Sequence, residues 1–349
     1  MQVTKVDHCH IGPGQPVFVI AELSGNHGQS LEKAKEMILA AAEAGASAIK
    51  LQTYTPDTIT LNVSHGEFFI QDQDNLWKGR SLYDLYSEAM TPWEWHQPLF
   101  DYAKSLGLVA FSTPFDLTAV EYLEKLNVPC YKIASFENND HALLAAVAKT
   151  GKPVIMSTGM AEIHELAEAV TVLKQHGCRD LILLKCTSHY PAEPVDANLS
   201  TIPHLAQLFD CQVGLSDHTQ GIGVSIASVI LGGTVIEKHF VIDRNEGGVD
   251  SEFSLEPREF KSLVMETERA RVALGRVHYG CTAKEIASRK YRRSLYVSRD
   301  MSAGDILTVD NLRSVRPGLG IAPKYLHQLL GKAVKQDIAA GTAMCWEFV

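Results

Sequence analysis

Short apolar stretches recur along the chain, and each one ends in a small group of polar or charged residues. Amphipathic segments separate them; residues 30–43, for example, place their apolar side chains on one stripe of a helix. Eight such repeats within the first 275 residues are typical of a closed (β/α)8 barrel. The sequence therefore predicts a TIM barrel over residues 1–275. Its strands are expected at residues 17–21, 48–51, 109–111, 130–133, 154–156, 181–184, 212–215 and 235–236.

Helix boundaries are also marked in the sequence. Residues 91–94, Thr-Pro-Trp-Glu, have the spacing of a capping box with proline at the first helical position. Residues 161–176 are amphipathic and are followed by Gly177, where a helix commonly ends. Residues 257–274 are expected to form the eighth barrel helix. Residues 62–79 interrupt the alternation after the second strand, and we expect them to make a wall or lid over the barrel mouth.

The pattern changes after Gly275. Residues 276–290 form a polar linker, and residues 291–349 show short alternating stretches without further strand–helix repeats. Two segments of this region, 299–307 and 336–344, are weakly similar, because each has an Asp followed by an Ala-Gly turn and an aliphatic residue. We expect a small β-rich C-terminal domain with two related corners. Since about 60 residues bury little surface, this domain is expected to dock on another surface.

Composition and charge narrow the functional classes. The chain of 349 residues is 46% hydrophobic and has a formal net charge of −9, which disfavours nucleic acid and anionic membranes as partners. No apolar run reaches the roughly 18 residues of a membrane span, and the first residues lack the apolar core of a signal peptide. The seven cysteines are scattered and include no CxxC pair, which indicates reduced thiols. We therefore expect a cytoplasmic protein.

The polar groups that follow the apolar stretches carry the chemistry. In a (β/α)8 barrel the C-terminal ends of all strands meet at one mouth, where active sites form. These groups are therefore expected to converge on one site. They include Glu22, Lys50, Gln52, Thr113, Lys132, Ser135, Ser157, Ser216, His218, Glu237 and His239.

Two histidines at neighbouring strand ends are candidate metal ligands. His218 and His239 each end a predicted strand, and adjacent strands lie about 4.8 Å apart, so two imidazoles there could reach one ion. Either histidine alone would more often be structural than a metal ligand. Two nitrogens with otherwise oxygen or water ligands favour Mn²⁺ or Mg²⁺ over a closed zinc site.

Two lysines end the second and fourth strands. Lys50 and Lys132 would be costly inside a barrel unless each meets an anion or loses its charge. They could form salt bridges to Glu22 or Glu137, clamp a phosphate, or form a Schiff base. Hydroxyls on several strand ends, Ser135 among them, favour phosphate. Because the chain has no Walker A motif and no complete GxGxxG, the phosphate is expected on a small substrate.

Glu22 lies where the first strand meets its loop, in the segment AELSGNH. An acid at that depth is either the partner of a lysine or a general base whose pKa is set by the pocket. The residues alone leave both roles open.

Nine motifs along the chain together resemble the sialic acid synthase family. They span nearly the whole chain in the order expected for that family. The motifs are AELSGNH (21–27), AIKLQTYTPDT (48–58), FSTPFD (111–116), YKIAS (131–135), STGM (157–160), KCTSHYP (185–191), GLSDHT (214–219), EKHF (237–240) and RPGLG (316–320).

The resemblance implies an architecture and an activity. It implies a TIM barrel followed by a C-terminal SAF domain, similar to type III antifreeze proteins. The implied reaction condenses phosphoenolpyruvate with an N-acetylated amino sugar to give a nine-carbon 2-keto acid and phosphate, with Mn²⁺ or Mg²⁺ as cofactor. It also implies a domain-swapped homodimer, in which the C-terminal domain of one subunit caps the barrel of the other.

The resemblance also implies roles for individual residues. His218 and His239 would hold the metal, and Glu22 would be the base. Arg316 would reach in from the partner's cap and contact an acetamido group. Phosphoenolpyruvate would be bound by Lys50, Thr113, Lys132, Ser135, Ser157 and Ser216, and the sugar would be faced by Gln52, Glu137, Tyr190 and Asp250.

Within the family, the Leu-Ser-Gly at 23–25 and the segments 50–60 and 76–86 most resemble the pseudaminic acid synthases, a transferase branch. The sugar would then be 2,4-diacetamido-2,4,6-trideoxy-β-L-altropyranose, and the product would serve flagellin glycosylation or a surface polysaccharide. The alternative within the family is an N-acetylneuraminate or legionaminic acid synthase. Other classes are a Schiff-base aldolase using Lys132 or Lys50, and a non-enzymatic carbohydrate- or ice-binding protein.

Overall fold

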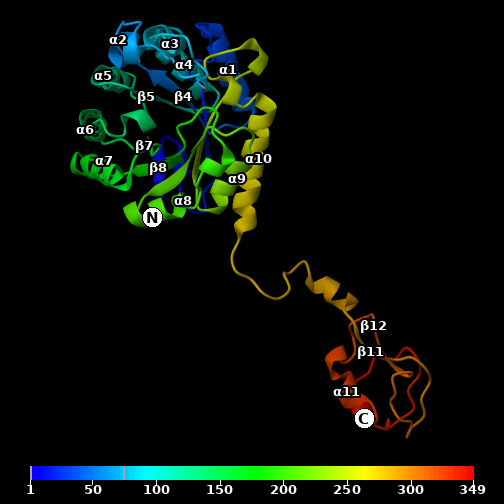
Figure 1. Cartoon of the computed structure of the whole chain (residues 1–349). Coiled ribbons are helices and arrows are strands. Elements are labelled where there is room, and N and C mark those ends of the chain that lie inside the picture. Colours follow the sequence, from blue (N-terminus) through cyan, green and yellow to red (C-terminus); the bar gives the residue numbers. More distant parts are fainter. Residues whose placement is uncertain (1, 74) are drawn as a thin grey trace. The chain divides into compact units, whose positions relative to one another are not determined.

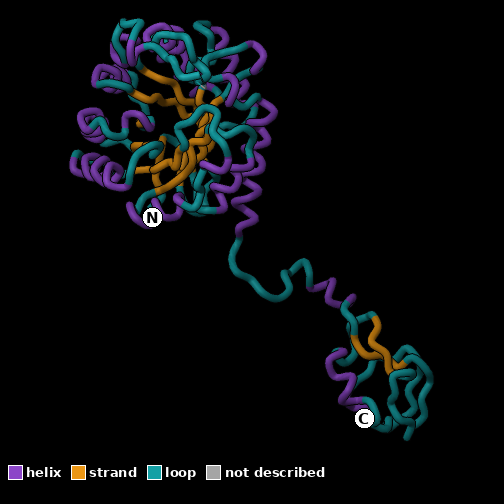
Figure 2. Tube along the Cα trace, viewed as in Figure 1, coloured by secondary structure: helices purple, strands orange, loops and turns teal. Residues whose placement is uncertain are grey.

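The computed structural model describes residues 2–73 and 75–349. The chain divides into two compact units, Met1–Gly275 and Arg276–Val349. In the first unit, a closed barrel of eight strands is surrounded by helices (Figure 1, Figure 2). The predicted (β/α)8 TIM barrel is therefore confirmed.

The barrel strands follow one another in chain order, and β10 closes the ring against β3. All neighbouring pairs are parallel. Because helices cover the outside and side chains fill the inside, the strands are buried on both faces. The strands are β3 (Phe18–Glu22), β4 (Ala48–Thr53), β5 (Val109–Pro114), β6 (Tyr131–Ile133), β7 (Val154–Ser157), β8 (Leu181–Cys186), β9 (Gln212–Asp217) and β10 (Val235–His239).

Several of the polar groups that follow the apolar stretches belong to the strands themselves. Strand β4 continues to Thr53 and β10 continues to His239, beyond the apolar residues that predicted them. The register places His239 beside Glu22 and Glu22 beside Lys50. The strand ends thus bring an imidazole, a carboxylate and an ammonium group together.

The helices around the barrel begin and end close to the positions that the sequence indicates. One local signal was wrong: α4 begins at Trp93 with Pro92 as its N-cap and no side-chain cap. The Thr91 hydroxyl instead lies 3.1 Å from Nε2 of buried His27, so a tertiary contact replaces the expected capping box. The outer helices are α1 (Leu31–Glu43), α4 (Trp93–Ser105), α5 (Leu117–Lys125), α6 (His141–Lys149), α7 (Ile163–Gln175), α8 (Thr201–Phe209), α9 (Gly223–Ile230) and α10 (Pro257–Leu274).

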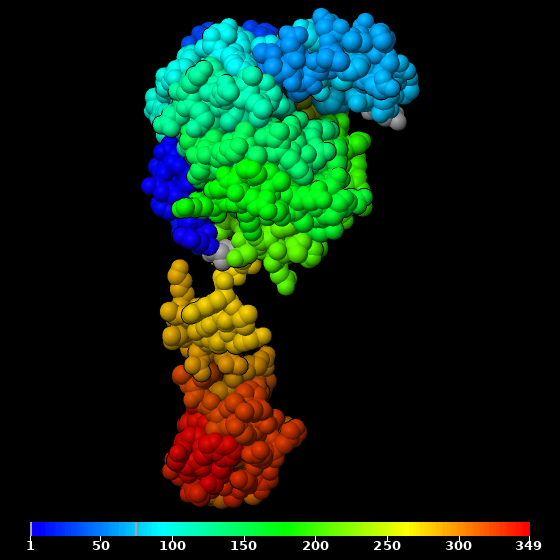
Figure 3. Space-filling view, turned by 90° about the vertical axis from the view of Figure 1, so that its left-hand side faces the viewer, coloured from blue at the N-terminus to red at the C-terminus, as the bar shows by residue number. Residues whose placement is uncertain are grey.

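Two additions interrupt the plain barrel. A hairpin of β1 (Thr4–Val6) and β2 (Cys9–Ile11) precedes the first barrel strand. After β4 the chain forms an insertion that contains α2 (Pro56–Ile59) and α3 (Leu82–Ala89) before it reaches α4. Figure 3 shows part of this insertion, in light blue, as a prominent part of the surface of the first unit.

The second unit has its own apolar core. Strands β11 (Ser294–Val297) and β12 (Leu312–Val315) pair antiparallel, and a short helix α11 (Leu326–Leu329) follows. Side chains such as Leu295, Met301 and Ile338 pack together inside it. The first part of this unit, up to the 3₁₀ helix Ile286–Tyr291, is exposed.

The two similar segments of the second unit lie against each other. Met301 and Ile338 exchange backbone hydrogen bonds of 2.9 and 2.8 Å. The Asp300 carboxylate accepts from the backbone of Ala340, and the Asp337 carboxylate accepts from the backbone of Ala303, both at 2.8 Å. The expected related corners are therefore present as a reciprocal pair. Among the described residues, no helix is long and apolar enough to cross a membrane.

Candidate active site

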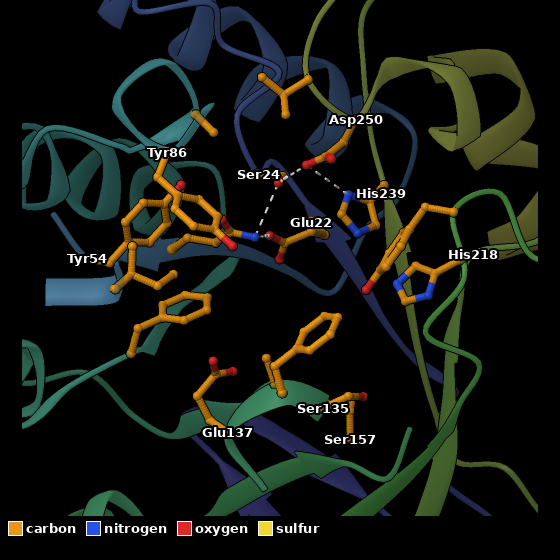
Figure 4. A pocket seen from close by; sticks show the side chains of 18 of the residues that line it. Glu22, Ser24, Tyr54, Tyr86, Ser135, Glu137, Ser157, His218, His239 and Asp250 are labelled. Carbon is orange, nitrogen blue, oxygen red and sulfur yellow. Dashed lines mark hydrogen bonds and ion pairs between the residues drawn. The ribbon is translucent and has the colours of Figure 1, made fainter. Parts of the chain in front are cut away.

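A cavity of about 510 Å³ opens at the C-terminal ends of the barrel strands. Except for Thr113 and Arg316, every residue predicted to belong to the site lines it. Figure 4 shows several of these side chains around the cavity. The predicted residues that line it are Glu22, Lys50, Gln52, Lys132, Ser135, Glu137, Ser157, Tyr190, Ser216, His218, His239 and Asp250.

Glu22 and Lys50 form a buried ion pair in the cavity. Glu22 Oε2 lies 2.5 Å from Lys50 Nζ, and the two residues are 1% and 4% exposed. Gln52 donates to Glu22 Oε1 at 3.2 Å. Burial raises the pKa of Glu22 to about 7, against the attraction of Lys50. Lys50 therefore forms the salt bridge to Glu22 that was one of its predicted roles. Glu22 is both the partner of Lys50 and a carboxyl group with a pKa suited to a general base.

Thr113 contacts the Glu22–Lys50 pair from outside the cavity. It does not line the cavity, but its hydroxyl accepts a hydrogen bond of 3.0 Å from Lys50 Nζ. Burial alone would lower the pKa of Lys50, but the carboxylates of Glu22 and Glu237 outweigh it and raise the pKa. Lys50 is therefore a fixed cation that can meet an anionic ligand.

Lys132 has a different environment. Its ammonium group donates to Ser157 Oγ at 2.7 Å and lies 3.4 Å from Glu237 Oε1. Burial lowers the pKa of Lys132, and the attraction of Glu237 opposes this shift. Lys132 therefore meets Glu237, whereas the sequence suggested Glu22 or Glu137 as a partner.

Glu237 is the functional candidate that the sequence analysis left without a role. It is 5% exposed, and Ser216 donates to its Oε1 at 3.1 Å. Burial would raise its pKa, but Lys132 and Lys50 hold the pKa below its ordinary value. Its position two residues before His239 on one strand was the available signal, since alternate side chains share a face. Its Oε2 atom is buried without a hydrogen-bond partner.

Glu137 lies in the 3₁₀ turn Ser135–Glu137 that follows β6. Its Oε2 atom is buried without a hydrogen-bond partner. Burial raises the pKa of Glu137 to about 7, and Lys132 opposes the shift. Ser135 in the same turn accepts from the backbone of Gly159 at 3.1 Å, which joins the loops after β6 and β7. This turn therefore presents a hydroxyl and a carboxyl to the cavity.

His218 and His239 have ring centroids 5.3 Å apart. The Nδ1 atom of His218 lies 2.9 Å from the Thr187 carbonyl; this contact favours a proton on Nδ1, so Nε2 is the nitrogen that could bind a metal ion. The Nδ1 atom of His239 is buried without a hydrogen-bond partner. Burial holds the pKa of His239 far below its ordinary value, and His218 adds to this effect. His239 is therefore neutral, as a metal ligand must be.

The two imidazoles could supply two nitrogens to an open metal site. Asp250 Oδ2 lies 3.9 Å from His239 Nδ1, beyond hydrogen-bond distance. Ser24 donates a hydrogen bond to the same carboxyl group, and burial raises the pKa of Asp250. Among the described residues, no group of three or more His, Cys, Asp or Glu side chains is placed to hold a metal ion. Further coordination would come from substrate or water.

An aromatic row lies beside the histidines. The Tyr190 ring packs against His218, with centroids 4.5 Å apart, and against Trp77 at 5.9 Å. The indole of Trp77 donates to the backbone carbonyl of Val249 at 2.8 Å. Trp77 and Ile70 come from the insertion and line the cavity, so the insertion forms part of its wall.

A buried ion pair outside the cavity joins the ends of β9 and β10, the two strands that precede His218 and contain His239. Lys238 is fully buried, and its ammonium group lies 2.9 Å from Asp217 Oδ2. Asp217 also accepts hydrogen bonds from Thr219 and Ser225. Because Asp217 and Lys238 directly precede His218 and His239, this pair fixes the backbone that presents both imidazoles. Neither residue of the pair is predicted from the sequence pattern.

Arg316 belongs to the second unit. It is exposed and follows β12. Its predicted role depends on a second subunit and stays a prediction.

Comparison with known proteins identifies the family. The NeuB family model matches residues 37–279, and the SAF domain model matches residues 292–348. The chain belongs to the NeuB family. This NeuB-family protein is 45% identical to the pseudaminic acid synthase of Campylobacter jejuni, over 94% of its length and 95% of that protein. It is 42% identical to the pseudaminic acid synthase of Helicobacter pylori, over 95% of its length and 97% of that protein.

A solved structure shares the fold of this NeuB-family protein. The N-acetylneuraminic acid (sialic acid) synthetase of Leptospira borgpetersenii, in complex with citrate, is 35% identical and has a TM-score of 0.72. The match covers 82% of this chain and 95% of that one. The family and the fold predicted from the sequence are therefore confirmed.

Proposed function

We propose that this protein is a pseudaminic acid synthase. It condenses phosphoenolpyruvate with 2,4-diacetamido-2,4,6-trideoxy-β-L-altropyranose and water to give pseudaminic acid and phosphate. The observation that carries this proposal is the cavity in which buried Lys50 and Lys132 lie with His218 and His239. The choice of sugar is supported by 45% identity to a pseudaminic acid synthase, against 35% to a sialic acid synthetase.

The lysine end of the cavity suits phosphoenolpyruvate, which carries a carboxylate and a phosphate. Lys50 and Lys132 supply two positive charges, each already held by a hydroxyl group. Ser135, Ser157 and Ser216 add donors from three strand ends. Charge-assisted hydrogen bonds of this kind are short and directional, so they would fix the vinyl carbon toward the aldehyde.

The bond changes follow from this placement. The C3 atom of phosphoenolpyruvate bonds to the aldehyde carbon, the aldehyde oxygen takes the electron pair and then a proton to become a hydroxyl group, and positive charge develops at C2. Water adds at C2, and Glu22 takes a proton from that water. The C2–O bond then breaks, phosphate leaves with the proton of the C2 hydroxyl group, and C2 becomes the ketone of the product. A divalent Mn²⁺ or Mg²⁺ ion held by His218 and His239 would supply Lewis-acid polarisation of the aldehyde.

The sugar end of the cavity has polar groups at fixed positions. Gln52 donates to both Glu22 and Ser24, so its amide is oriented along the cavity wall. Glu137, Tyr190 and Asp250 face the cavity from three other loops. We propose that these residues bind the sugar's hydroxyl and acetamido groups.

Phosphate release tests the proposal. The purified protein would be incubated with Mn²⁺, phosphoenolpyruvate and one of three sugars: the altrose derivative above, the precursor of legionaminic acid, or N-acetylmannosamine. The highest kcat/KM is expected with the altrose derivative. A higher kcat/KM with either other sugar would overturn the choice of substrate. Borohydride trapping of a keto acid on Lys132, with phosphate release absent for all three sugars, would instead favour the aldolase.

The metal and the dimer are part of the same proposal. EDTA is expected to abolish phosphate release, and added Mn²⁺ or Mg²⁺ to restore it. For the domain-swapped homodimer, two inactive variants would be unfolded, mixed and refolded: Glu22→Gln and Arg316→Ala. A mixed dimer would combine an intact barrel from one chain with an intact Arg316 from the other, so activity should return. No recovery in a confirmed mixed dimer would contradict the capping role.

A further inference from the structure

The cavity has two chemically different halves. All the charged side chains that line it come from the barrel strands or the loops that directly follow β6 and β10. The insertion between β4 and α4 contributes no charged side chain among its described lining residues. Its aliphatic lining residues are Ile59, Ile70, Leu82, Leu85 and Ala89, and it also supplies Tyr54, Asn75, Trp77 and Tyr86.

The part of the insertion that contains Tyr54 and α3 faces the imidazoles across the cavity, whereas Trp77 of the insertion lies in the aromatic row beside them. Tyr54 and Tyr86 lie on one side of the cavity in Figure 4, and His218 and His239 lie on the other. The Tyr54 ring packs edge-on against Tyr86, with centroids 5.8 Å apart. A sugar whose aldehyde lies near the histidines would therefore extend its far carbons toward the apolar half.

The insertion is fastened to the barrel. At its far end, Gln29 donates to the backbone carbonyls of Glu88 and Met90 at 2.9 and 2.6 Å. Gly25 allows α3 to come close, because a Cβ atom there would lie 2.9 Å from Ala89 Cα. Together with the bond from Trp77 to Val249 at 2.8 Å, these contacts make a preformed wall. A preformed apolar wall selects for shape and polarity more strongly than a mobile loop.

We propose that Ile59, Ile70, Leu82 and Leu85 form the wall that seats the C6 methyl group of the sugar and selects it over a hydroxymethyl group. This inference rests on the proposed function and adds the residues that determine specificity. The methyl group gains from apolar burial, whereas a hydroxyl group packed against these four aliphatic side chains loses water and gains no hydrogen-bond partner from them. Apolar sites discriminate such pairs by roughly 10- to 100-fold.

Two matched sugars isolate this effect. N-acetylmannosamine and its 6-deoxy analogue differ only in the oxygen at C6. With the wild-type protein, kcat/KM is expected to be roughly tenfold or more higher for the 6-deoxy sugar. A ratio of one or below would overturn the proposal without any variant. Failure of phosphate release with the altrose derivative would instead count against the proposed function.

Two variants then locate the wall. Ile70→Asn and Leu82→Asn introduce an amide that can pair with a C6 hydroxyl, so the 6-deoxy preference is expected to fall about tenfold. Leu61→Asn is the matched control, because Leu61 lies in the same insertion, is 60% exposed and does not line the cavity. Loss of activity on both sugars with an unchanged ratio, in folded variants, would show that the wall does not select at C6.

Discussion

Replacing Glu22 by Gln tests the base in the proposed reaction. The change removes the charge but nearly preserves the size of the side chain. In the wild type, one carboxylate oxygen lies 2.5 Å from Lys50 Nζ and the other accepts from Gln52 at 3.2 Å. In the amide, an NH₂ group replaces one of these two oxygens, so either Lys50 or Gln52 faces a donor where it had an acceptor.

The size of the effect follows from these contacts. Loss of a general base commonly lowers kcat by about 10²- to 10⁴-fold, which corresponds to roughly 3–5 kcal/mol in the barrier. Removing one charge of a buried ion pair costs about 3–5 kcal/mol of folding free energy, and Glu237 remains as a second carboxylate that attracts Lys50. The variant should therefore remain folded at moderate temperature while its kcat falls steeply.

The pH profile of kcat/KM distinguishes a base from a structural residue. Because burial raises the pKa of Glu22 to about 7, wild-type kcat/KM should rise as the pH approaches 7 and then level off. The variant should lose this acidic limb. Glu32→Gln is the control, since Glu32 is 77% exposed and should affect neither kcat nor the profile. An unchanged kcat, or an acidic limb that survives in the Glu22 variant, would refute the role.

Three further predictions concern other parts of the site. Burial raises the pKa of Glu137 from 4.5 to about 7, so the wild type should become less stable by up to roughly 3 kcal/mol as the pH rises through that range. Glu137→Gln should remove this dependence of the unfolding free energy on pH. Unfolding free energies from urea titrations that change equally with pH in both proteins would contradict this. Lys238→Met should destabilise by about 3 kcal/mol in urea, because Asp217 loses its buried partner; a loss below 1 kcal/mol would show the pair to be dispensable. With ¹⁸O in the bridging oxygen of phosphoenolpyruvate, mass spectrometry should find the label in phosphate, and label in the keto acid would exclude C–O cleavage.

The barrel and most of the cavity could be predicted from the sequence because both depend on a repeated local pattern. Each polar group follows an apolar stretch, and the closed ring brings the C-terminal strand ends to one mouth. The pattern therefore predicts that Lys50 and His239, which are far apart in the chain, lie in one site. The register then adds what the pattern lacks, namely that Glu22 lies between them.

The remaining features depend on tertiary contacts that a local pattern does not contain. The sequence does not distinguish Glu237 from any other acidic residue of a strand, because its partner Lys132, 3.4 Å away, lies on another strand. Lys238 and Asp217 point away from the cavity, and their pairing depends on the registry of two strands. The expected capping box fails because Thr91 contacts His27, 64 positions earlier in the chain.

The reciprocal hydrogen bonds of the second unit have a consequence for its assembly. Asp300 closes the turn that contains Ala340, and Asp337 closes the turn that contains Ala303. Each turn also has a bond of its own, since the backbone of Asp305 donates to the Ser302 carbonyl and that of Thr342 donates to the Ala339 carbonyl. The two aspartates therefore add an acceptor from the other half to turns that already close locally. A polypeptide cut between residues 307 and 336 would lose these added bonds until the fragments meet again, so each half should be less ordered alone than in the intact domain.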